Sequence, residues 1–190
     1  HFALLLQAMS EFELAREHFL KAINLDQNFA EAYFHLGLLL NDLEEFEEAK
    51  NNLEKTTDVD QNHKLAYYHL ARLLTDPEDF ELAKKNYLTA IDIDENFRDA
   101  HYYLGKLLKN GIKNDNDGTL VEEPNYKEAE MHFKKTIEIS PQFYKAHYNL
   151  ALVLNSQNQI DEAEKYLQNS IKINNDYAKA HFHLALLLKI

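Results

Sequence analysis

A six-residue segment recurs five times along this 190-residue chain, and its spacing constrains the fold more than any other feature. The copies are AYFHLG at 32–37, AYYHLA at 66–71, AHYYLG at 100–105, AHYNLA at 146–151 and AHFHLA at 180–185. Neighbouring copies start 34 residues apart except once, where the interval is 46 residues. A fixed period of this length indicates a repeat protein, in which each unit buries its apolar face against its neighbours. One unit carries an insertion of 12 residues.

Each unit contains the pattern of two amphipathic helices. In the first helix, leucines such as Leu36, Leu39 and Leu40 recur at spacings of three and four and form one apolar face. In the second helix, an aromatic residue or isoleucine is followed by alanine and then by a bulky apolar residue, as in Phe46, Ala49 and Leu53. Few glycines and prolines interrupt the chain, so we expect helices joined by short loops.

Small residues recur where the two helices of a unit must cross. They are Gly37, Ala71, Gly105, Ala151 and Ala185 on the first helix, and Ala15, Ala49, Ala83, Ala129 and Ala163 on the second. Helices that pack about 8–10 Å apart need small side chains at their contact. The pattern therefore predicts helical hairpins. A third series of small residues, Ala22, Thr56, Ala90, Thr136 and Ser170, is expected to contact the next unit.

Polar residues near the loops predict the helix ends. Each first helix is expected to have an N-cap from the series Asp26, Asp60, Asp94, Ser140 and Asn174, because the side-chain oxygens of these residues satisfy free backbone amides. Ser10 and Glu13 match a capping box. Pro77 and Pro124 lie near the starts of second helices, where the missing N–H is tolerated.

These repeats closely resemble the tetratricopeptide repeat family, and the resemblance covers the chain except for its insertion. It implies an all-α fold, a right-handed superhelical solenoid of antiparallel helix pairs. The single domain 1–190 is divided into a partial repeat 1–29, repeats 30–63, 64–97, 98–143 and 144–177, and a lone helix 178–190. Repeat 98–143 carries the insertion at about 110–125. This division counts eleven helices. Both ends stop within a unit, so we expect a fragment of a longer protein or ends covered by another copy.

The resemblance also implies that a partner binds in a concave groove lined by the first helices, at the second, fifth, ninth and twelfth repeat positions. The candidate residues are Phe34, Tyr68, Tyr102, Tyr148 and Phe182 at the fifth position and Leu38, Arg72, Lys106 and Leu152 at the ninth. Fifth and ninth positions share one helix face. The aromatic residues form either a contact surface or a packing ladder along the stack. Arg72 and Lys106 favour a carboxylate on the ligand, or are simply solvated.

Several more specific sites are excluded or disfavoured. The carboxylate clamp that some family members use for chaperone tails is absent, because Phe34, Leu38 and Tyr68 occupy clamp positions. Histidines recur at the sixth repeat position, where neighbouring first helices are expected about 8–10 Å apart. Side chains could narrow that gap, but no neighbouring Asp or Glu supplies further metal ligands, so hydrogen-bonded histidines are expected instead. Acidic runs begin the second helices, where they complement the helix dipole rather than form a catalytic pair. The insertion fails the calcium-loop pattern at both ends, and Asp117–Gly118 favours a turn or short hairpin.

Composition excludes further classes of function. The formal net charge of −12 disfavours binding to nucleic acid and to acidic membrane surfaces, and by itself favours a basic or neutral partner. The chain has no cysteine, so disulfides and thiolate catalysis are excluded, and a cytoplasmic location is compatible. No apolar run reaches the roughly 20 residues that cross a bilayer.

We therefore predict a non-catalytic scaffold or adaptor that binds a peptide segment of a partner protein in its groove, without cofactor or metal. Two alternatives stay open. In the first alternative, the chain is the recognition arm of a larger enzyme such as a peptide glycosyltransferase. Repeats of such an enzyme carry a row of asparagines at the sixth repeat position, whereas this chain has histidine at most of these places and only Asn149 matches. Alternatively, the repeats self-associate through their open ends.

Overall fold

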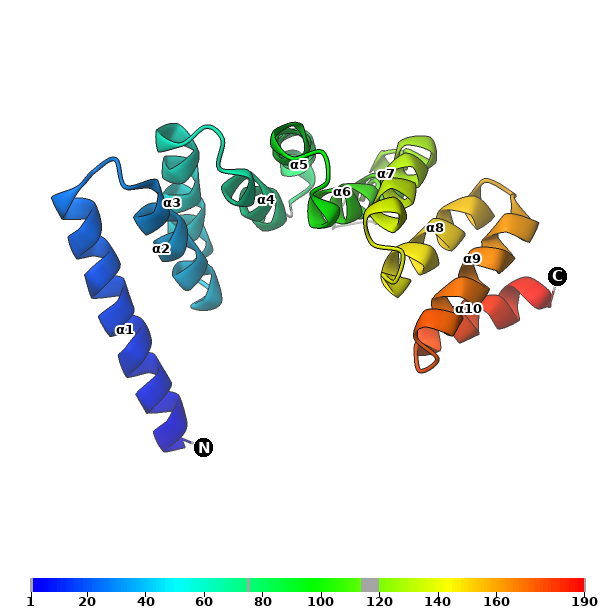
Figure 1. Cartoon of the computed structure of the whole chain (residues 1–190), viewed down its shortest axis with the longest axis horizontal. Helices are drawn as coiled ribbons and strands as arrows, with labels where there is room; N and C mark the ends of the chain where they lie inside the picture. The colour runs from blue at the N-terminus through cyan, green and yellow to red at the C-terminus, as the bar shows by residue number, and fades with distance from the viewer. Residues whose placement is uncertain (1, 75, 114–119, 190) are drawn as a thin grey trace. The chain divides into compact units, whose positions relative to one another are not determined.

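The computed structural model describes residues 2–74, 76–113 and 120–189. These residues form ten α-helices, one short 3-10 helix and two short strands (Figure 1). The fold class is an all-α helical repeat of the solenoid type, as the 34-residue period predicts. The chain divides into two compact units, residues 1–74 and 75–190, which are described in turn. The boundary falls between the two helices expected for repeat 64–97.

Unit 1 contains four helices. They are α1 (Phe2–Leu25), α2 (Ala30–Asp42), α3 (Phe46–Val59) and α4 (Lys64–Leu73). Helices α2 and α3 form a hairpin, with α1 packed against α2 and α4 packed against α3 (Figure 1). The apolar face predicted for the first helix is buried, since Leu36 and Leu40 are each 2 % exposed. Leu53 of α3 is also fully buried, in a cluster with Phe34 and Leu70.

The partial first repeat differs from its prediction. The count of eleven helices assumed two helices before residue 29, whereas residues Phe2–Leu25 form the single helix α1. Position 10 therefore lies inside a helix, and the capping box expected at Ser10 does not start one. Because no Gly or Pro interrupts residues 2–25, nothing in the local sequence ends the helix earlier.

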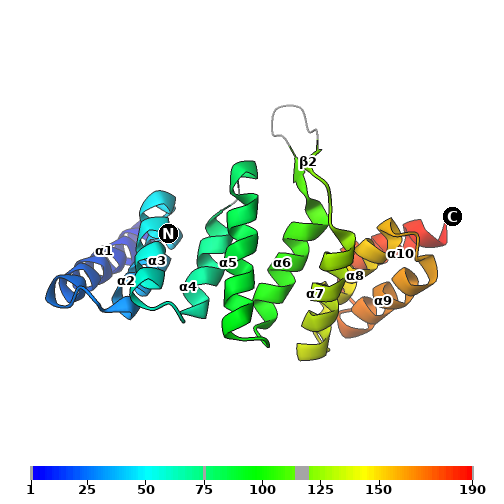
Figure 2. The ribbon, with the colours of Figure 1, turned by 90° about the horizontal axis from the view of Figure 1, so that it is seen from above.

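Unit 2 contains the remaining elements. They are the 3-10 helix η1 (Pro77–Asp79), α5 (Phe80–Ile93), α6 (Arg98–Asn110), α7 (Tyr126–Ile139), α8 (Tyr144–Ser156), α9 (Ile160–Ile173) and α10 (Ala178–Leu188). Helices α6 and α7 form one hairpin and α8 and α9 the next, while α5 packs on α6 and α10 on α9 (Figure 2). The first helices α6, α8 and α10 thus recur along this unit, each followed by its second helix where one is described.

The predicted close crossings are confirmed at two glycines. A Cβ added to Gly37 would lie 2.9 Å from Cγ of Leu53, and a Cβ added to Gly105 would lie 2.9 Å from Cε1 of Phe133. Their alanine counterparts on the second helices, Ala49 and Ala129, are fully buried. In the hairpins α2–α3 and α6–α7, the first helix therefore meets the second with no room for a side chain at this position.

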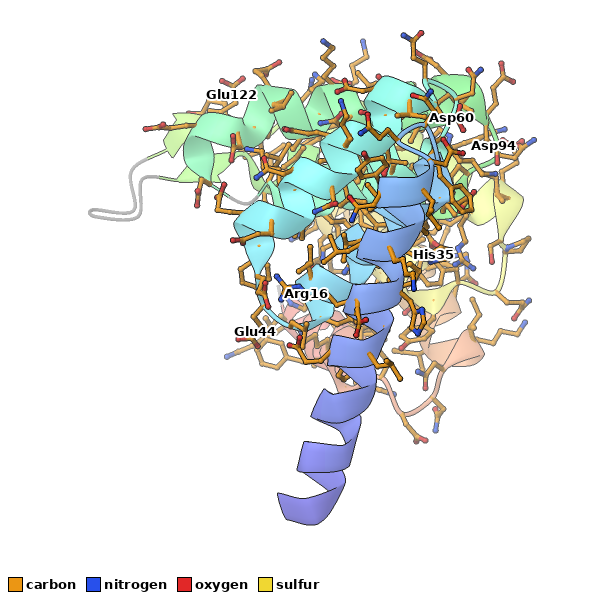
Figure 3. The ribbon with its side chains drawn as sticks, turned by 90° about the vertical axis from the view of Figure 1, so that its left-hand side faces the viewer. Arg16, His35, Glu44, Asp60, Asp94 and Glu122 are labelled. Atoms are coloured by element: carbon orange, nitrogen blue, oxygen red, sulfur yellow. The ribbon has the colours of Figure 1, made fainter. Side chains whose placement is uncertain are left out.

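The polar residues expected as N-caps serve a different purpose. Asp26, Asp60, Asp94 and Asn174 each accept a hydrogen bond from the backbone N–H two residues later, at 2.9–3.2 Å. They close the loop after one helix, and Figure 3 labels Asp60 and Asp94 among them. The residue that caps the next helix comes three residues later and is aromatic or histidine, for example Phe29, His63 and Phe97. The N-cap prediction was wrong by one turn because these side chains bond within the loop itself.

The insertion in repeat 98–143 forms a β-hairpin. Strand β1 (Ile112–Lys113) pairs antiparallel with β2 (Leu120–Glu122), with Ile112 opposite Glu122 and Lys113 opposite Leu120. Gly111 ends α6 at φ +62°, and a Cβ there would clash with the carbonyl oxygen of Glu122. The strands confirm the predicted hairpin, while the expected Asp117–Gly118 turn lies outside the described residues.

In unit 1, an ion pair joins α1 to the turn between α2 and α3. Nη1 of Arg16 on α1 lies 3.0 Å from Oε1 of Glu45, in the turn between α2 and α3. The preceding residue, Glu44, has φ +63°, a conformation that costs free energy for a residue with a Cβ. Figure 3 shows Arg16 and Glu44 at this edge. Within the part of the chain that the structure describes, no helix is long and apolar enough to span a bilayer.

Candidate functional site

The aromatic residues predicted for the groove are mostly packing residues. Phe34, Tyr68, Tyr102 and Tyr148 are only 4–8 % exposed, whereas Phe182 on α10 is 61 % exposed. Their burial leaves little ring surface for a partner and agrees with the packing alternative at four of the five positions.

The buried rings pack on aromatic groups at the N-cap of the next first helix and within that helix. In unit 1, the ring of Phe34 lies 4.5 Å from that of His63 and 5.8 Å from that of His69, measured between centroids. In unit 2, Tyr148 lies 5.1 Å from Tyr177 and 5.6 Å from His183. Within each unit, the fifth repeat position therefore connects one first helix to the next.

Apart from Phe182, the accessible side chains of the predicted set are at the ninth repeat position. Arg72 is exposed, and Leu38, Lys106 and Leu152 are half-buried. The cations use the buried rings as support, since Cζ of Arg72 lies 5.6 Å from the centroid of the Tyr68 ring. Aromatic faces attract such cations and orient them.

A hollow of about 50 Å³ opens beside this position in unit 1. The unit 1 hollow is lined by Leu38 and Asn41 of α2, Leu53 of α3, and His69, Arg72 and Leu73 of α4. Two predicted residues, Leu38 and Arg72, thus meet at one hollow although they belong to successive repeats. Its floor is apolar and its rim carries an amide, an imidazole and a guanidinium.

A second hollow, of about 90 Å³, occupies the same repeat positions in unit 2. The unit 2 hollow is lined by Ala151, Leu152 and Asn155 of α8, Leu167 of α9, and His183, Leu186 and Leu187 of α10. Leucine, asparagine and histidine recur at matching positions of the two hollows. The ninth position of the following helix differs, with Arg72 in unit 1 and Leu186 in unit 2.

Sequence reasoning missed the polar residues that line these hollows besides Arg72: Asn41, Asn155, His69 and His183. Asn41 and Asn155 are at the twelfth repeat position, three residues after Leu38 and Leu152, so they share a helix face with those leucines. The resemblance named this position, but no residues were assigned to it. The histidines were considered only as metal ligands or hydrogen-bonding groups, so their position beside the hollows was not predicted.

Burial and neighbouring cations keep these rim histidines neutral at pH 7. Burial, followed by the positive charge of Arg72, lowers the pKa of His69 to about 4. Burial, followed by the charge of Lys109, lowers the pKa of His183 below its usual value. Both imidazoles therefore offer one donor and one acceptor rather than a positive charge.

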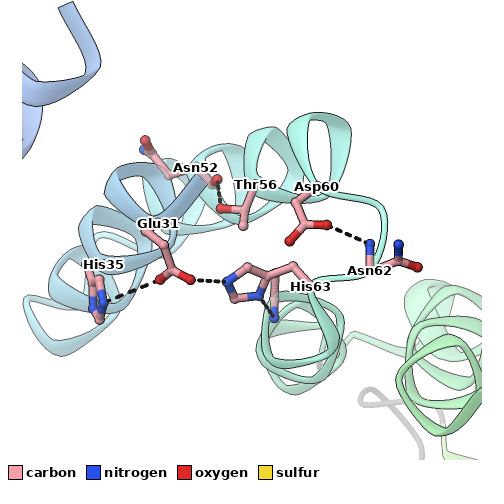
Figure 4. A network of polar contacts seen from close by, with 8 residues as sticks. Glu31, His35, Asn52, Thr56, Asp60, Asn62 and His63 are labelled. Carbon is pink, nitrogen blue, oxygen red and sulfur yellow. Dashed lines mark hydrogen bonds and ion pairs between the residues drawn. The ribbon is translucent and has the colours of Figure 1, made fainter. Parts of the chain in front are cut away.

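Other histidines are structural. His63 caps α4, because the N–H of Ala66 donates to its Nδ1 at 3.1 Å, while its Nε2 lies 3.5 Å from Oε1 of Glu31. The second carboxylate oxygen of Glu31 lies 3.7 Å from Nε2 of His35 (Figure 4). This network joins α2 to the start of α4.

In unit 2, His101 of α6 and His132 of α7 face each other with their Nδ1 atoms 2.9 Å apart. Nε2 of His101 lies 3.2 Å from the carbonyl oxygen of Glu95, so it carries the proton and His132 donates through Nδ1. Burial and the neighbouring His101 lower the pKa of His132 to about 4. Among the described residues, no three His, Asp or Glu side chains gather closely enough to hold a metal ion.

Solved structures with the same arrangement of helices are available for comparison. YrrB has a TM-score of 0.74 at 27 % identity, over 96 % of this chain and 88 % of that chain, and is described as a TPR protein with an unusual peptide-binding site. MamA has a TM-score of 0.74 at 25 % identity, over 91 % and 94 %. PilF of Pseudomonas aeruginosa, at 22 % identity and a TM-score of 0.70 over 86 % and 69 %, shares the fold.

The sequence itself also matches known families. No curated protein matches it. Two family models described as tetratricopeptide repeat match residues 120–188 and residues 30–63 and 65–97, and a third, described as TPR repeat, matches residues 6–42. These matches fall on the repeats that the 34-residue period defines, and such repeats are protein-interaction scaffolds. The chain belongs to the tetratricopeptide repeat family.

Proposed function

We propose that this chain is a non-catalytic scaffold that holds a peptide segment of a partner protein against the inner faces of its first helices. The observation that carries the proposal is the recurrence of one hollow, at the same repeat positions, in both units. Each hollow includes residues predicted for the groove, Leu38 and Arg72 in unit 1 and Leu152 in unit 2.

The chemistry of the hollows suits a peptide. Their volumes, about 50 and 90 Å³, are those of one side chain rather than of a larger substrate. Leucine floors receive an apolar side chain, and burial of such a group is favourable in proportion to the apolar area removed from water. The amides of Asn41 and Asn155 on the rims offer both donors and acceptors, which match the N–H and C=O groups of an extended backbone.

The other predicted residues have distinct places in this proposal. Lys106 and Arg72 are cations at the edge of the inner faces, and exposed Phe182 offers a further apolar contact. The buried rings of Phe34, Tyr68, Tyr102 and Tyr148 position the helices and contribute little contact area. The peptide-binding site named for YrrB, a structure of similar fold at 27 % identity, supports the same class of ligand.

The test is selection from a display library of random 12-residue peptides with the whole chain as bait. Peptides recovered with the wild type are then measured against the double variant Leu38→Ser and Leu152→Ser. We expect affinity to fall about tenfold, because each serine removes apolar surface from a hollow. The matched control is Leu82→Ser with Met131→Ser, which changes exposed apolar residues on second helices.

Unchanged affinity in the Leu38→Ser and Leu152→Ser variant, together with lost affinity in the control variant, would place binding on the second helices and contradict the proposal. Recovery of no peptide by the wild type would contradict peptide binding altogether. Circular dichroism of both variants checks that the helices are retained.

A further inference from the structure

Helix α6, which contacts α8, carries two lysines at the repeat positions that line the unit 2 hollow on α8. Lys106 and Lys109 occupy the same repeat positions on α6 as Leu152 and Asn155 on α8, and the latter two line the hollow. Helices α6 and α8 contact each other, and Nδ2 of Asn149 on α8 donates to Oη of Tyr102 on α6 at 3.3 Å. The two lysines therefore extend the lined face of unit 2 by one first helix.

The position of Lys106 is fixed by aromatic rings. Its Nζ lies 5.9 Å from the ring centroid of Tyr102 and 5.2 Å from that of Tyr103. Cation–π contacts hold the ammonium group over these rings and keep its long side chain from sampling many rotamers. An ammonium group that is already oriented loses less entropy when it binds an anion.

The environment of the second lysine, Lys109, disfavours its charged form. Burial, followed by the charge of Lys106, lowers the pKa of Lys109, so the two ammonium groups repel each other. The charge of Lys109 also lowers the pKa of His183, which lines the unit 2 hollow. Its field therefore reaches the hollow. A carboxylate placed beside the two lysines would relieve the repulsion and gain charge-assisted hydrogen bonds.

The geometry of the repeat gives an approximate distance between the two lysines on α6 and the unit 2 hollow. Neighbouring helices pack about 8–10 Å apart. An extended chain rises about 3.3 Å per residue. The unit 2 hollow lies between α8 and α10, so its distance from α6 is about one and a half helix spacings, or about 12–15 Å. A peptide that crosses this distance advances by about four residues.

We propose that unit 2 binds an extended peptide in which an apolar side chain fills the unit 2 hollow and a carboxylate about four residues away contacts Lys106 and Lys109. The inference rests on the proposed function and adds the class of peptide. The net charge of −12 does not oppose it at contact range, because the charges beyond about 10 Å are screened at physiological salt.

The experiment compares selections from the same random 12-residue library. With the wild-type chain we expect Asp or Glu to be enriched about four residues from Leu, Ile, Val, Met or Phe. Synthetic peptides from this pool should lose about tenfold in affinity for the variant Lys106→Gln with Lys109→Gln. The control variant Lys165→Gln with Lys172→Gln removes the same charge from α9 and should bind as the wild type does.

A peptide-side change makes the result independent of protein folding. Replacing the peptide's acidic residue with its amide should weaken binding to the wild type about tenfold, and should have no effect on binding to the lysine variant. Peptides that depend on Leu152 but show no acidic enrichment, or that bind the lysine variant unchanged, overturn the carboxylate contact while leaving the proposed function intact. An acidic residue enriched at no fixed distance from the apolar residue overturns the spacing. Recovery of no peptide overturns both proposals.

Discussion

The two hollows share their positions in the repeat but differ in one side chain. Both have leucine floors and an Asn–His rim, yet the ninth position of the following first helix is Arg72 in unit 1 and Leu186 in unit 2. The repeat therefore determines where a hollow forms, since small residues and leucines set the distance between helices. The ninth position decides its chemistry, because packing does not depend on what that half-exposed side chain is.

The two units differ again in the contact between their first and second helices. The buried pair His101 and His132 of unit 2 corresponds to Tyr33 and Asn52 of unit 1. Unit 1 has no histidine at either of these two places. Unit 2 therefore carries a titratable core contact that unit 1 lacks at the same place.

The largest effect expected is on the floors of the hollows. Leu53→Ala in unit 1 and Leu167→Ala in unit 2 should each destabilise the chain by about 2–5 kcal/mol, because both side chains are at most 1 % exposed and alanine leaves a cavity. Urea unfolding, with hydrogen exchange to locate the unfolding unit, measures both. Nearly equal losses would support equivalent floors, and a loss confined to one variant would break the equivalence.

Lowering the pH should destabilise unit 2 more than unit 1. His132 binds fewer protons when folded than when unfolded between its folded-state pKa of about 4 and the usual 6.5, so stability falls as the pH is lowered through that window. The loss is about 3 kcal/mol when the pH has fallen to the folded pKa. Urea unfolding at pH 7 and at pH 4.5 measures it, and His132→Gln should flatten the dependence.

The matched control for the acid prediction is His69→Gln in unit 1. Burial also lowers the pKa of His69 to about 4, but its side chain is half-buried, so solvent screening makes its contribution to stability smaller. If His132→Gln leaves the pH dependence of unfolding as it is in the wild type, the buried histidine pair is not its source.

Exchanging the ninth-position residues should exchange ligand preference. Arg72→Leu is expected to weaken binding of acidic peptides to unit 1, and Leu186→Arg to strengthen their binding to unit 2, each by about 1 kcal/mol as for a partly exposed ion pair. Fluorescence anisotropy with labelled acidic peptides and their amide counterparts measures both. An effect of equal size on the amide peptides would show that shape, not charge, distinguishes the hollows.

The smallest effect concerns the turns between first and second helices. Glu44 in unit 1 and Asn158 in unit 2 occupy equivalent positions with φ of +63° and +64°. Asparagine tolerates this conformation better than glutamate, so Glu44→Asn should stabilise unit 1 by about 0.5–1 kcal/mol. The reverse change, Asn158→Glu, should destabilise unit 2 by a similar amount in thermal unfolding. Equal stability of each variant and the wild type would mean that the turn relaxes around glutamate.

Much of the fold could be predicted from particular residues. The spacing of Gly37, Gly105 and their alanine counterparts predicted the hairpins, because a close crossing excludes any larger side chain. The N-caps were misassigned at Asp26, Asp60 and Asp94. An aspartate side chain can accept a hydrogen bond at the start of a helix or within a loop, and here each one accepts from the backbone N–H two residues later in the loop. The continuity of α1 was missed because the repeat alignment was extended into a partial unit.

The sequence by itself determined the repeat, the helix pairs and the face on which the ninth position lies, because these follow from local periodicity and from side-chain size. Only the tertiary structure decided that Phe34, Tyr68, Tyr102 and Tyr148 are packing residues, since an aromatic residue suits a surface and an interior equally well. It also brought Asn41 together with His69, and Asn155 together with His183, at the rims of two hollows. Those pairs come from successive repeats, and the depth of a hollow depends on how closely neighbouring helices approach.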